Sequence, residues 1–406
     1  MTTISQLSVE NFLSLQKVDI AFSNLNVLVG PNGAGKTNVL KVFQFLGDVA
    51  RRDLVLAIDE FGGFENLQYR GADRKADAIR LNLTGEITQH ASVSAPDEYK
   101  LTLWERVILP TERHPHGRRL IQRNEVIVVK RTAGRGRRIT LSGNTVKVEP
   151  IEPNSRKRRP SSISVQGAST GLATLRKLGE DYEASQVEAL AQVFEQLRLF
   201  EIDVERIRLP VPRTRNPETL RADGSNLAAF LYWMSIEHPS AFELVCDDVR
   251  FVLPGFKDFA FTPLGGADEA VRLDILESGL SGSTPLGRAS FGTIRSIALF
   301  AMLHDPNPPK LTCLEEIDHG LHPHALDRLV DRLREASVNT QIILATHSPA
   351  LVNRLSASEL IVVERVHTTG SSRVFKPDIA KVTSLQNDTG YGLGELWFSG
   401  ALGGSL

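Results

Sequence analysis

Apolar positions in the first fifty residues follow one period and then another. Alternation with a period of two predicts edge strands over residues 4–9 and 18–22, which we expect to form a hairpin. A continuous apolar run at 25–30 predicts a buried strand, and apolar residues over 39–50 have helical spacing. The chain should therefore open with a hairpin, a buried strand, a glycine-rich loop and a helix.

The last third of the chain alternates between helical and strand-like patterns. Helices are predicted over 293–305, 324–336 and 349–355, and strands over 310–316, 340–348 and 359–366. Such alternation predicts a parallel sheet with helices on its faces, that is, an α/β fold.

The middle of the chain has a different pattern. Short strand-like runs at 78–87, 125–131 and 144–150 are separated by arginine-rich connections. Residues 172–200 read as helix, 208–225 as irregular chain because prolines and a glycine interrupt it, and a helix restarts near 226. The expected parts are an N-terminal lobe (1–90), a basic insertion (91–165), a helical segment with a linker (166–225) and a C-terminal lobe (226–406).

Length and composition narrow the class of protein. With 406 residues, 41% of them hydrophobic, the chain can bury a sizeable core in two or three domains. No signal-peptide pattern and no run of about 18 apolar residues occurs, so we expect a cytoplasmic protein without membrane contact. The 47 basic and 48 acidic residues nearly balance, so any attraction to nucleic acid must be local.

The sequence GPNGAGKT, residues 30–37, lies between the predicted buried strand and helix. This G-x-x-x-x-G-K-[ST] pattern predicts a phosphate-binding loop, because its glycines let backbone N–H groups surround phosphates. Lys36 would reach the β- and γ-phosphates, and the Thr37 hydroxyl would ligate Mg²⁺. The predicted ligand is ATP with Mg²⁺, and the predicted nucleotide-binding residues are Gly30, Pro31, Asn32, Gly33, Ala34, Gly35, Lys36, Thr37 and Asn38.

Two carboxylates close a predicted strand in the last third. Ligands of parallel sheets sit outside the C-terminal ends of the strands, so Glu315 and Glu316 would face the nucleotide. Glu315 would hold Mg²⁺ through water, and Glu316 would orient and deprotonate the attacking water. His347 ends the following strand and could donate to the γ-phosphate; a structural histidine is the alternative.

A metal-hydrolase interpretation competes for the same stretch. It needs Glu316, Asp318, His319, His322 and His324 to converge on one ion. The stretch lacks the histidine pair spaced i, i+4 around a glutamate on one helix face that zinc hydrolysis uses. The plainer interpretation is that His322 and His324 cap and pack a helix.

A second candidate anion site precedes the helix predicted near residue 294. Ser290, Gly292 and Thr293 could bind an anion through a hydroxyl and backbone N–H groups at a helix N-terminus. An ordinary helix N-cap at Ser290 is an equally good interpretation of these residues alone.

The order of these segments resembles that of a known family. Walker A, signature, Walker B, D-loop region and H-loop occur in this order at residues 30–37, 290–293, 311–316, 321–323 and 346–348. The chain resembles the ABC-type ATPases of the SMC and RecF branch, and most closely the standalone predicted AAA ATPases related to the OLD family. The resemblance covers nearly the whole chain and is least specific over 91–164.

The resemblance implies an ABC-type P-loop head with a mixed sheet flanked by helices, a basic β-rich insertion and a helical subdomain. It also implies a head-to-tail homodimer, or a higher oligomer, in which Ser290 and Gly292 of one copy contact the γ-phosphate held by Lys36 of the other. A Q-loop glutamine near the metal is implied too. Gln68 is the candidate, and an ordinary surface glutamine is the alternative.

Similar standalone ATPases often work with a separately encoded nuclease in defence against phage or foreign DNA. The resemblance therefore implies an ATP-hydrolysing switch that controls such an effector. Residues 348–406, after the H-loop, are too few for the Toprim nuclease domain of OLD proteins, so a partner would do the cutting. The alternatives are a RecF-like repair ATPase that acts directly on DNA, and a transporter ATPase subunit, against which the basic insertion argues.

Three features depart from the family pattern. Ala289 and Phe291 replace the usual neighbours of the signature serine, Glu315 stands where aspartate is commoner, and Ile317 replaces a proline. Glu315 keeps an oxygen ligand. The changes beside the signature serine bear on how firmly a dimer would close.

Residues 113–159 are strongly basic, and Glu125, Glu149 and Glu152 are the only acids among them. Such a segment can neutralise phosphates and give salt-dependent, sequence-independent binding. A solvated loop or a partner-docking face is the alternative, because aromatic residues that could stack on bases are absent. The candidate contacts to DNA or a partner are Arg118, Arg119, Arg135, Arg137, Arg138, Arg156, Lys157, Arg158 and Arg159.

Overall fold

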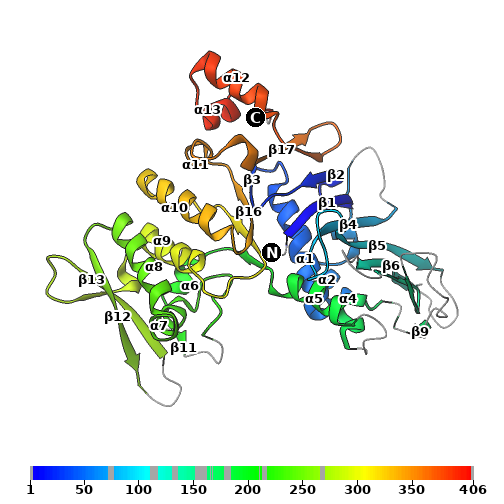
Figure 1. The fold of residues 1–406 in the computed structure, drawn as a ribbon, viewed down its shortest axis with the longest axis horizontal. Coiled ribbons are helices and arrows are strands. Elements are labelled where there is room, and N and C mark those ends of the chain that lie inside the picture. Colours follow the sequence, from blue (N-terminus) through cyan, green and yellow to red (C-terminus); the bar gives the residue numbers. More distant parts are fainter. Residues whose placement is uncertain are drawn as a thin grey trace. The chain divides into compact units, whose positions relative to one another are not determined.

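The structure is a computed structural model. It describes residues 3–71, 77–109, 118–129, 136–150, 162–164, 166, 168–177, 184–209, 211–212, 217–265 and 270–403. The chain divides into two compact units, whose helices and strands are labelled in Figure 1. Unit 1 comprises residues 1–197, 358–377 and 402–406, and unit 2 comprises residues 198–357 and 378–401. Within the described ranges, no helix has both the length and the apolar character needed to cross a membrane.

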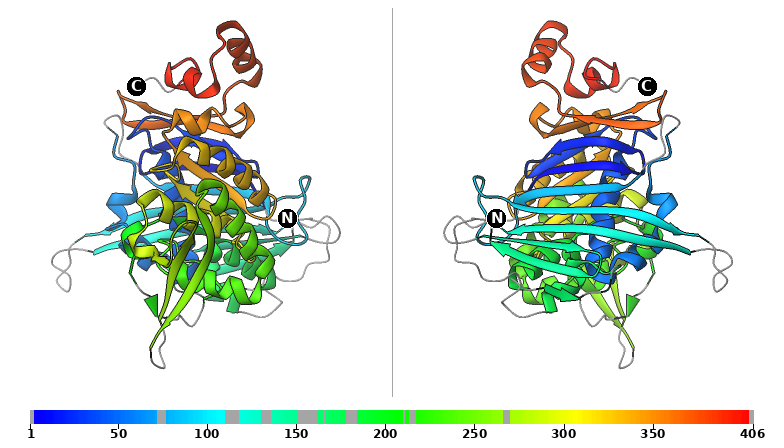
Figure 2. Two further views of the ribbon diagram at one scale, coloured as in Figure 1. Left: turned by 90° about the vertical axis from the view of Figure 1, so that its left-hand side faces the viewer. Right: turned by 90° about the vertical axis from the view of Figure 1, so that its right-hand side faces the viewer.

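An eight-stranded antiparallel sheet in the order β2-β1-β4-β5-β6-β7-β8-β9 dominates unit 1, and Figure 2 shows its strands side by side. Its strands are β1 (Thr3–Phe12), β2 (Leu15–Ala21), β4 (Ile79–Glu86), β5 (Asp97–Ile108), β6 (Arg118–Val129), β7 (Arg137–Ser142), β8 (Thr145–Pro150) and β9 (Ser162–Ser164). The predicted N-terminal hairpin is confirmed. Its first strand is not an edge strand, because β1 pairs with β4 as well as with β2.

The strands predicted in the middle of the chain extend this same sheet. Alternating burial along β4 shows that one face of the sheet packs against a core. Helix α5 (Ala184–Gln196) contributes to that core, where the rings of Tyr99 and Phe194 lie 5.9 Å apart. The short helices α4 (Gly171–Thr174) and η1 (Leu175–Lys177) precede α5.

The second strand group of unit 1 carries the predicted phosphate-binding loop. Strand β3 (Leu25–Val29) is buried throughout and runs parallel to β17 (Leu360–Val366), which pairs antiparallel with β18 (Ser371–Phe375). Helix α1 (Lys36–Arg52) follows the loop, and α2 (Leu54–Glu60) and α3 (Phe64–Leu67) follow α1. The predicted order of buried strand, loop and helix is confirmed.

Unit 2 contains the predicted parallel strands. Strands β10 (Arg198–Phe200), β15 (Leu311–Glu315) and β16 (Gln341–Thr346) pair in parallel. The helices are α6 (Val204–Ile207), α7 (Leu227–Glu237), α8 (Pro239–Val252), α9 (Phe291–Leu303), α10 (Pro323–Ala336), α11 (Pro349–Val352), α12 (Ile379–Thr389) and α13 (Leu393–Phe398).

Two predictions of local structure in this region need correction. The helix predicted over 172–200 is wrong at its end, because residues 198–200 form β10 beside β15 and bury Phe200. The chain predicted as irregular over 208–225 includes the two-residue strand β11 (Val211–Pro212), which pairs with β13 (Ala270–Glu277). In both places pairing with a distant strand outweighs local pattern.

An antiparallel group in unit 2 packs on helices through aromatic rings. Strand β12 (Phe256–Leu264) pairs with β13, which also pairs with β14 (Ser283–Pro285) ahead of the turn Leu286–Arg288. Phe242 on α8 contacts Phe259 and Phe261 of β12, with ring centroids 6.0 Å apart in each pair. These contacts fix the hairpin to α8.

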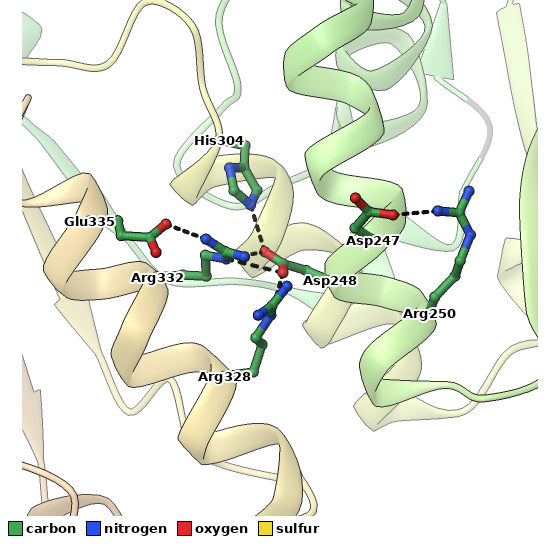
Figure 3. A network of polar contacts seen from close by, with 7 residues as sticks. All are labelled: Asp247, Asp248, Arg250, His304, Arg328, Arg332 and Glu335. Atoms are coloured by element: carbon green, nitrogen blue, oxygen red, sulfur yellow. Dashed lines mark hydrogen bonds and ion pairs between the residues drawn. The ribbon is translucent and has the colours of Figure 1, made fainter.

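A buried carboxylate joins α8, α9 and α10 (Figure 3). Asp248 on α8 is fully buried and accepts hydrogen bonds from His304 Nε2 at 2.6 Å, just after α9, and from Arg328 Nε at 2.6 Å on α10. Arg332 Nε, one turn further along α10, lies 2.9 Å from the same carboxylate. Burial alone would raise the pKa of the Asp248 carboxyl, but His304 and the two guanidinium groups outweigh it and hold that pKa below its ordinary value.

We expect Asp248→Asn to lower the free energy of unfolding by about 3 kcal/mol at neutral pH, because it leaves the partly buried guanidinium groups of Arg328 and Arg332 without their buried carboxylate. The folded-state pKa is depressed, so this stabilisation is fully present above the unfolded-state pKa of about 4 and is lost as the pH falls through the folded value. Urea unfolding of both proteins between pH 3 and 7 measures it.

Asp247→Asn is the matched control. Asp247 is the preceding residue of the same helix, but it pairs with Arg250 (Figure 3), and the Asp247 side chain is 51% exposed. Its replacement should change the unfolding free energy by less than about 1 kcal/mol. Equal losses in the two variants would show that the buried carboxylate does not hold the three helices together.

Candidate functional site

Backbone geometry explains the glycines of the loop between β3 and α1. Gly33 and Gly35 have φ angles of 77° and 107°, in the left-handed region that glycine tolerates best. A Cβ on Gly30 would lie 2.2 Å from the Val363 carbonyl oxygen, and one on Gly35 would lie 2.1 Å from Ser372 Oγ. The chain therefore requires glycine here for both conformation and space.

Lys36 lies at the first position of α1 with its ammonium group over the loop. Its Nζ donates to the carbonyl oxygens of Gly30 at 2.8 Å and Pro31 at 3.1 Å, and the residue is buried. Thr37 follows in the first turn of the helix. A lysine and a hydroxyl at a helix N-terminus beside glycine N–H groups form the arrangement that cradles phosphates.

Three side chains behind the loop hold it in shape, and no sequence motif marks two of them, Ser14 and Ser372. Ser14 Oγ lies 2.7 Å from Ser372 Oγ and accepts a hydrogen bond from Asn38 Nδ2 at 2.6 Å. Ser372 Oγ donates to the Ala34 carbonyl at 2.6 Å. Ser14 and Ser372 stand at opposite ends of the sequence without a local motif, so only the fold reveals this network.

A hollow of about 480 Å³ lies beside the first turn of α1 in unit 1. Its volume is within the range of small-ligand pockets. Gln68, the Q-loop candidate, lines it together with Asn38, and Gln68 also forms a β-bridge with Phe12. Gln68 therefore lines the same hollow as Asn38, and its role as a metal ligand stays a prediction. The other polar lining residues are Ser14, Asn66, Tyr69, Arg70, Arg365, His367, Thr368 and Thr369.

The paired carboxylates of unit 2 lie at the C-terminal end of β15. Glu315 is the last residue of the strand, and Glu316 follows it with a φ of 48°. A left-handed backbone at a residue with a long side chain costs about 1–3 kcal/mol and persists only where its surroundings enforce it. The Glu316 N–H donates to the Ala345 carbonyl of β16 at 2.9 Å, which fixes one side of the residue.

His347 lies against the Glu316 carboxylate. Its Nδ1 is 3.1 Å from Glu316 Oε1, and both side chains are about half-exposed. One residue earlier, Thr346 donates a hydrogen bond of 2.8 Å from Oγ1 to Asp318. The ends of β15 and β16 therefore present a carboxylate and an imidazole together, which suits the positioning of a water molecule.

The histidines named in the metal-hydrolase interpretation have other contacts. His322 caps α10 by accepting a hydrogen bond from the His324 N–H at 3.2 Å, and the His324 ring stacks on Phe251 with centroids 4.5 Å apart. His319 meets the ring of Phe291 edge-on at 5.7 Å. The predicted capping and packing roles of His322 and His324 are confirmed. Among the described residues, no group of three or more His, Cys, Asp or Glu side chains is arranged to hold a metal ion.

Ser290 is the N-cap of α9. Its Oγ accepts a hydrogen bond from the Thr293 N–H at 3.1 Å and lies 2.8 Å from Thr293 Oγ1. A Cβ on Gly292 would lie 2.5 Å from the Gly320 carbonyl oxygen, so glycine is required where α9 meets the turn after β15. The N-cap interpretation is confirmed, α9 begins at Phe291 rather than near 294, and anion binding stays a prediction.

The basic segment is less uniformly exposed than its composition suggests. Arg123 and Glu125 lie on the buried face of β6. Burial lowers the pKa of the Arg123 guanidinium and raises that of the Glu125 carboxyl. Arg119 pairs with Glu65 and Glu105, whereas Arg138 on β7 is exposed.

The remaining candidate contacts add little. Arg137 is half-buried on the opposite face of β7 from Arg138, and Arg118 is described only as the first residue of β6. The other candidates lie outside the described residues, namely Arg135, Arg156, Lys157, Arg158 and Arg159.

Comparisons with known families agree with this geometry. A family model described as "AAA domain, putative AbiEii toxin, Type IV TA system" matches residues 129–353, more than half of the chain. A second model, described as "AAA ATPase domain", matches residues 3–103. Together they cover the phosphate-binding loop, the signature serine, the paired carboxylates and His347.

One curated protein and two solved structures are similar over different extents. An OLD nuclease from Thermus scotoductus is 45% identical over 47 residues, which span 11% of this chain but only 9% of that protein. An Smc head bound to the C-terminal winged-helix domain of ScpA is 14% identical with a TM-score of 0.56, covering 94% of this chain and 99% of that one. An Smc head bound to the C-terminal domain of ScpA, from Pyrococcus furiosus, is 13% identical with a TM-score of 0.54, covering 96% and 100%. The predicted α/β fold of an ABC-type P-loop head is confirmed.

We expect Gly35→Ala to weaken ATP binding more than ten-fold, because the new methyl group collides with Ser372 and disturbs the loop. Gly33→Ala is the matched comparison: its φ is also left-handed, but no atom lies within 4 Å of its added Cβ, so a smaller loss is expected. Titration with a fluorescent ATP analogue measures both. Equal affinities would mean that the contact with Ser372 does not shape the loop.

Proposed function

The chain belongs to the AAA-domain family described as putative AbiEii toxins of type IV toxin–antitoxin systems and is an ATP-hydrolysing enzyme, and from this premise we propose that it is a Mg²⁺-ATP-dependent switch that dimerises to control a partner. The observation that carries the proposal is the pairing of Glu316 with His347 at the end of β15. A carboxylate held in a strained backbone beside an imidazole suits the activation of water for phosphoryl transfer.

The predicted metal donors suit Mg²⁺. A hydroxyl at Thr37, a carboxylate at Glu315 and the amide oxygen of Gln68 are hard oxygen ligands, which is the donor type this ion prefers. When bound, the ion would neutralise charge that develops on the β- and γ-phosphate oxygens. We propose Thr37 and Gln68 as ligands, and Glu315 as a ligand through water.

The chain's own groups then divide the work of hydrolysis. The loop N–H groups and the Lys36 ammonium hold the β- and γ-phosphates. Glu316 accepts a proton from the attacking water, and His347 keeps the Glu316 carboxylate in place and donates to the γ-phosphate.

We propose a head-to-tail dimer in which Ser290, Gly292 and Thr293 of one copy bind the γ-phosphate held by Lys36 of the other. The start of α9 supports this role, because Ser290 is exposed at the helix N-terminus and its Oγ lies 2.8 Å from the Thr293 hydroxyl. Phe291, 39% exposed in the signature itself, would then lie in the dimer interface.

The partner under control would be a separately encoded effector such as a nuclease, and the process would be defence against phage or foreign DNA. The partial similarity to an OLD nuclease and the toxin–antitoxin description of the family support this assignment. A RecF-like ATPase that acts directly on DNA is the second candidate. The exposed Arg138 in the basic segment favours it.

We expect Glu316→Gln to abolish ATP turnover and to trap an ATP-bound dimer, because the site keeps its shape but loses its base. Light scattering after size-exclusion chromatography, with and without ATP, measures the dimer. Lys36→Ala is the control that should stay monomeric with ATP. A monomeric Glu316→Gln variant that hydrolyses ATP at the wild-type rate would remove the role given to Glu316.

Direct DNA contact has its own test. Arg138→Ala should weaken DNA binding equally for unrelated sequences and lower the slope of log affinity against log salt by about one. Arg119→Ala should change that slope less, because Glu65 and Glu105 already pair with Arg119. Fluorescence anisotropy with duplex DNA at several salt concentrations measures both slopes, and identical values for Arg138→Ala and wild type would exclude this contact.

A further inference from the structure

Arg295, on the second turn of α9, is a buried cation that contacts the turn following β15, which begins with Glu316. The residue is only 7% exposed, and its guanidinium donates to the Glu316 carbonyl oxygen at 2.6 Å and to the Ile202 carbonyl oxygen at 3.4 Å. Its Nε has no hydrogen-bond partner among the described residues. Burying this charge is unfavourable, and the shortest hydrogen bond that compensates for it is the one to the Glu316 carbonyl oxygen.

The backbone of Glu316 needs such support. Its φ of 48° is unfavourable for a residue with a Cβ, and its N–H is already fixed by Ala345 of β16. On the other side, the Glu316 carbonyl accepts from Arg295 and from the His319 N–H at 3.2 Å. Arg295 is thus the only one of these donors to Glu316 that comes from α9.

The first turns of α9 touch this turn at a second point. The Gly292 backbone packs against the Gly320 carbonyl oxygen so closely that a Cβ would lie 2.5 Å from it. The Arg295 guanidinium carbon also lies 5.9 Å from the centre of the ring of Phe291, the first residue of α9. A shift of the N-terminal end of α9 would therefore move the turn that begins with Glu316.

We propose that Arg295 is a positioning residue that couples the signature turn of α9 to the carboxylate of Glu316. The inference rests on the proposed dimer, in which the signature of one copy serves the nucleotide of the other, while Glu316 serves the nucleotide of its own copy. Arg295 then links the two nucleotide sites: binding of the γ-phosphate at Ser290 sets the backbone from which Glu316 of the neighbouring site acts.

The carboxylates around Arg295 are consistent with this role. Burial lowers the pKa of the Arg295 guanidinium, and the nearby Asp318 and Glu316 carboxylates oppose that shift, so the group stays charged. A lysine cannot reproduce two donors in one plane, so it should support the carbonyl contact only in part.

The test separates positioning from stability. Arg295→Met should lower kcat about 10- to 100-fold while the half-saturating ATP concentration stays within about two-fold of wild type, because Glu316 is displaced and the phosphate-binding loop is untouched. Arg295→Lys should fall between the two. Binding of a fluorescent ATP analogue, steady-state turnover and thermal unfolding are measured for each.

Arg198→Met is the matched control. Arg198 is a part-buried arginine of β10 whose guanidinium donates to the Leu220 carbonyl at 3.3 Å and lies 3.5 Å from Asp305, and burial lowers its pKa as well. Its replacement should lower the unfolding temperature as much as Arg295→Met without changing kcat. If both variants reduce kcat in proportion to their loss of stability, Arg295 is only structural.

The dimer itself is checked in a separate arm. Adding Arg295→Met to Glu316→Gln should leave the ATP-dependent dimer intact. If Glu316→Gln alone does not dimerise, the proposed function fails. If Glu316→Gln dimerises with ATP and the single variant Arg295→Met turns over ATP at the wild-type rate, only the coupling through Arg295 is wrong.

Discussion

The candidate site in unit 2 depends on one constraint, the left-handed backbone of Glu316. A long acidic side chain rarely adopts φ of 48°, and here hydrogen bonds from neighbouring elements hold it there. This conformation turns the carboxylate out of the strand direction and toward His347. Hydrogen bonds to its main chain therefore fix the position of Glu316, the proposed general base.

The same dependence on supporting contacts appears in both units. In unit 1, Ser14, Asn38 and Ser372 brace the phosphate-binding loop from behind, and glycines at Gly30 and Gly35 leave no room for a Cβ. In unit 2, the buried carboxylate of Asp248 ties the end of α9 to α8 and α10. The helix that carries the signature is thus held at both ends, by Arg295 near its start and by His304 just after its end.

Much of the proposed catalytic site is predictable from the sequence, because short motifs contain its residues. The phosphate-binding loop needs glycines at fixed positions between a buried strand and a helix. Two glutamates at the C-terminal end of a parallel strand lie where such sheets bind their ligands. The supporting residues cannot be found in this way. Ser372 is 338 residues from Ala34, and Asp248 meets Arg328 and Arg332 across 80 and 84 residues, so only tertiary packing pairs them. The strand at 198–200 was missed for the same reason, since pairing with β15 decides its conformation.

The central claim is that a working site combines the phosphate-binding loop of one copy with the signature serine of another. Its most direct test is to mix two variants that are each inactive alone, Lys36→Ala and Ser290→Arg. A mixed dimer would contain one site with both defects and one intact site. ATP hydrolysis should rise above that of either variant alone, to at most about a quarter of the wild-type rate, which random pairing and independent sites would give. A mixture that stays inactive, or a Ser290→Arg protein that is active by itself, would contradict the account.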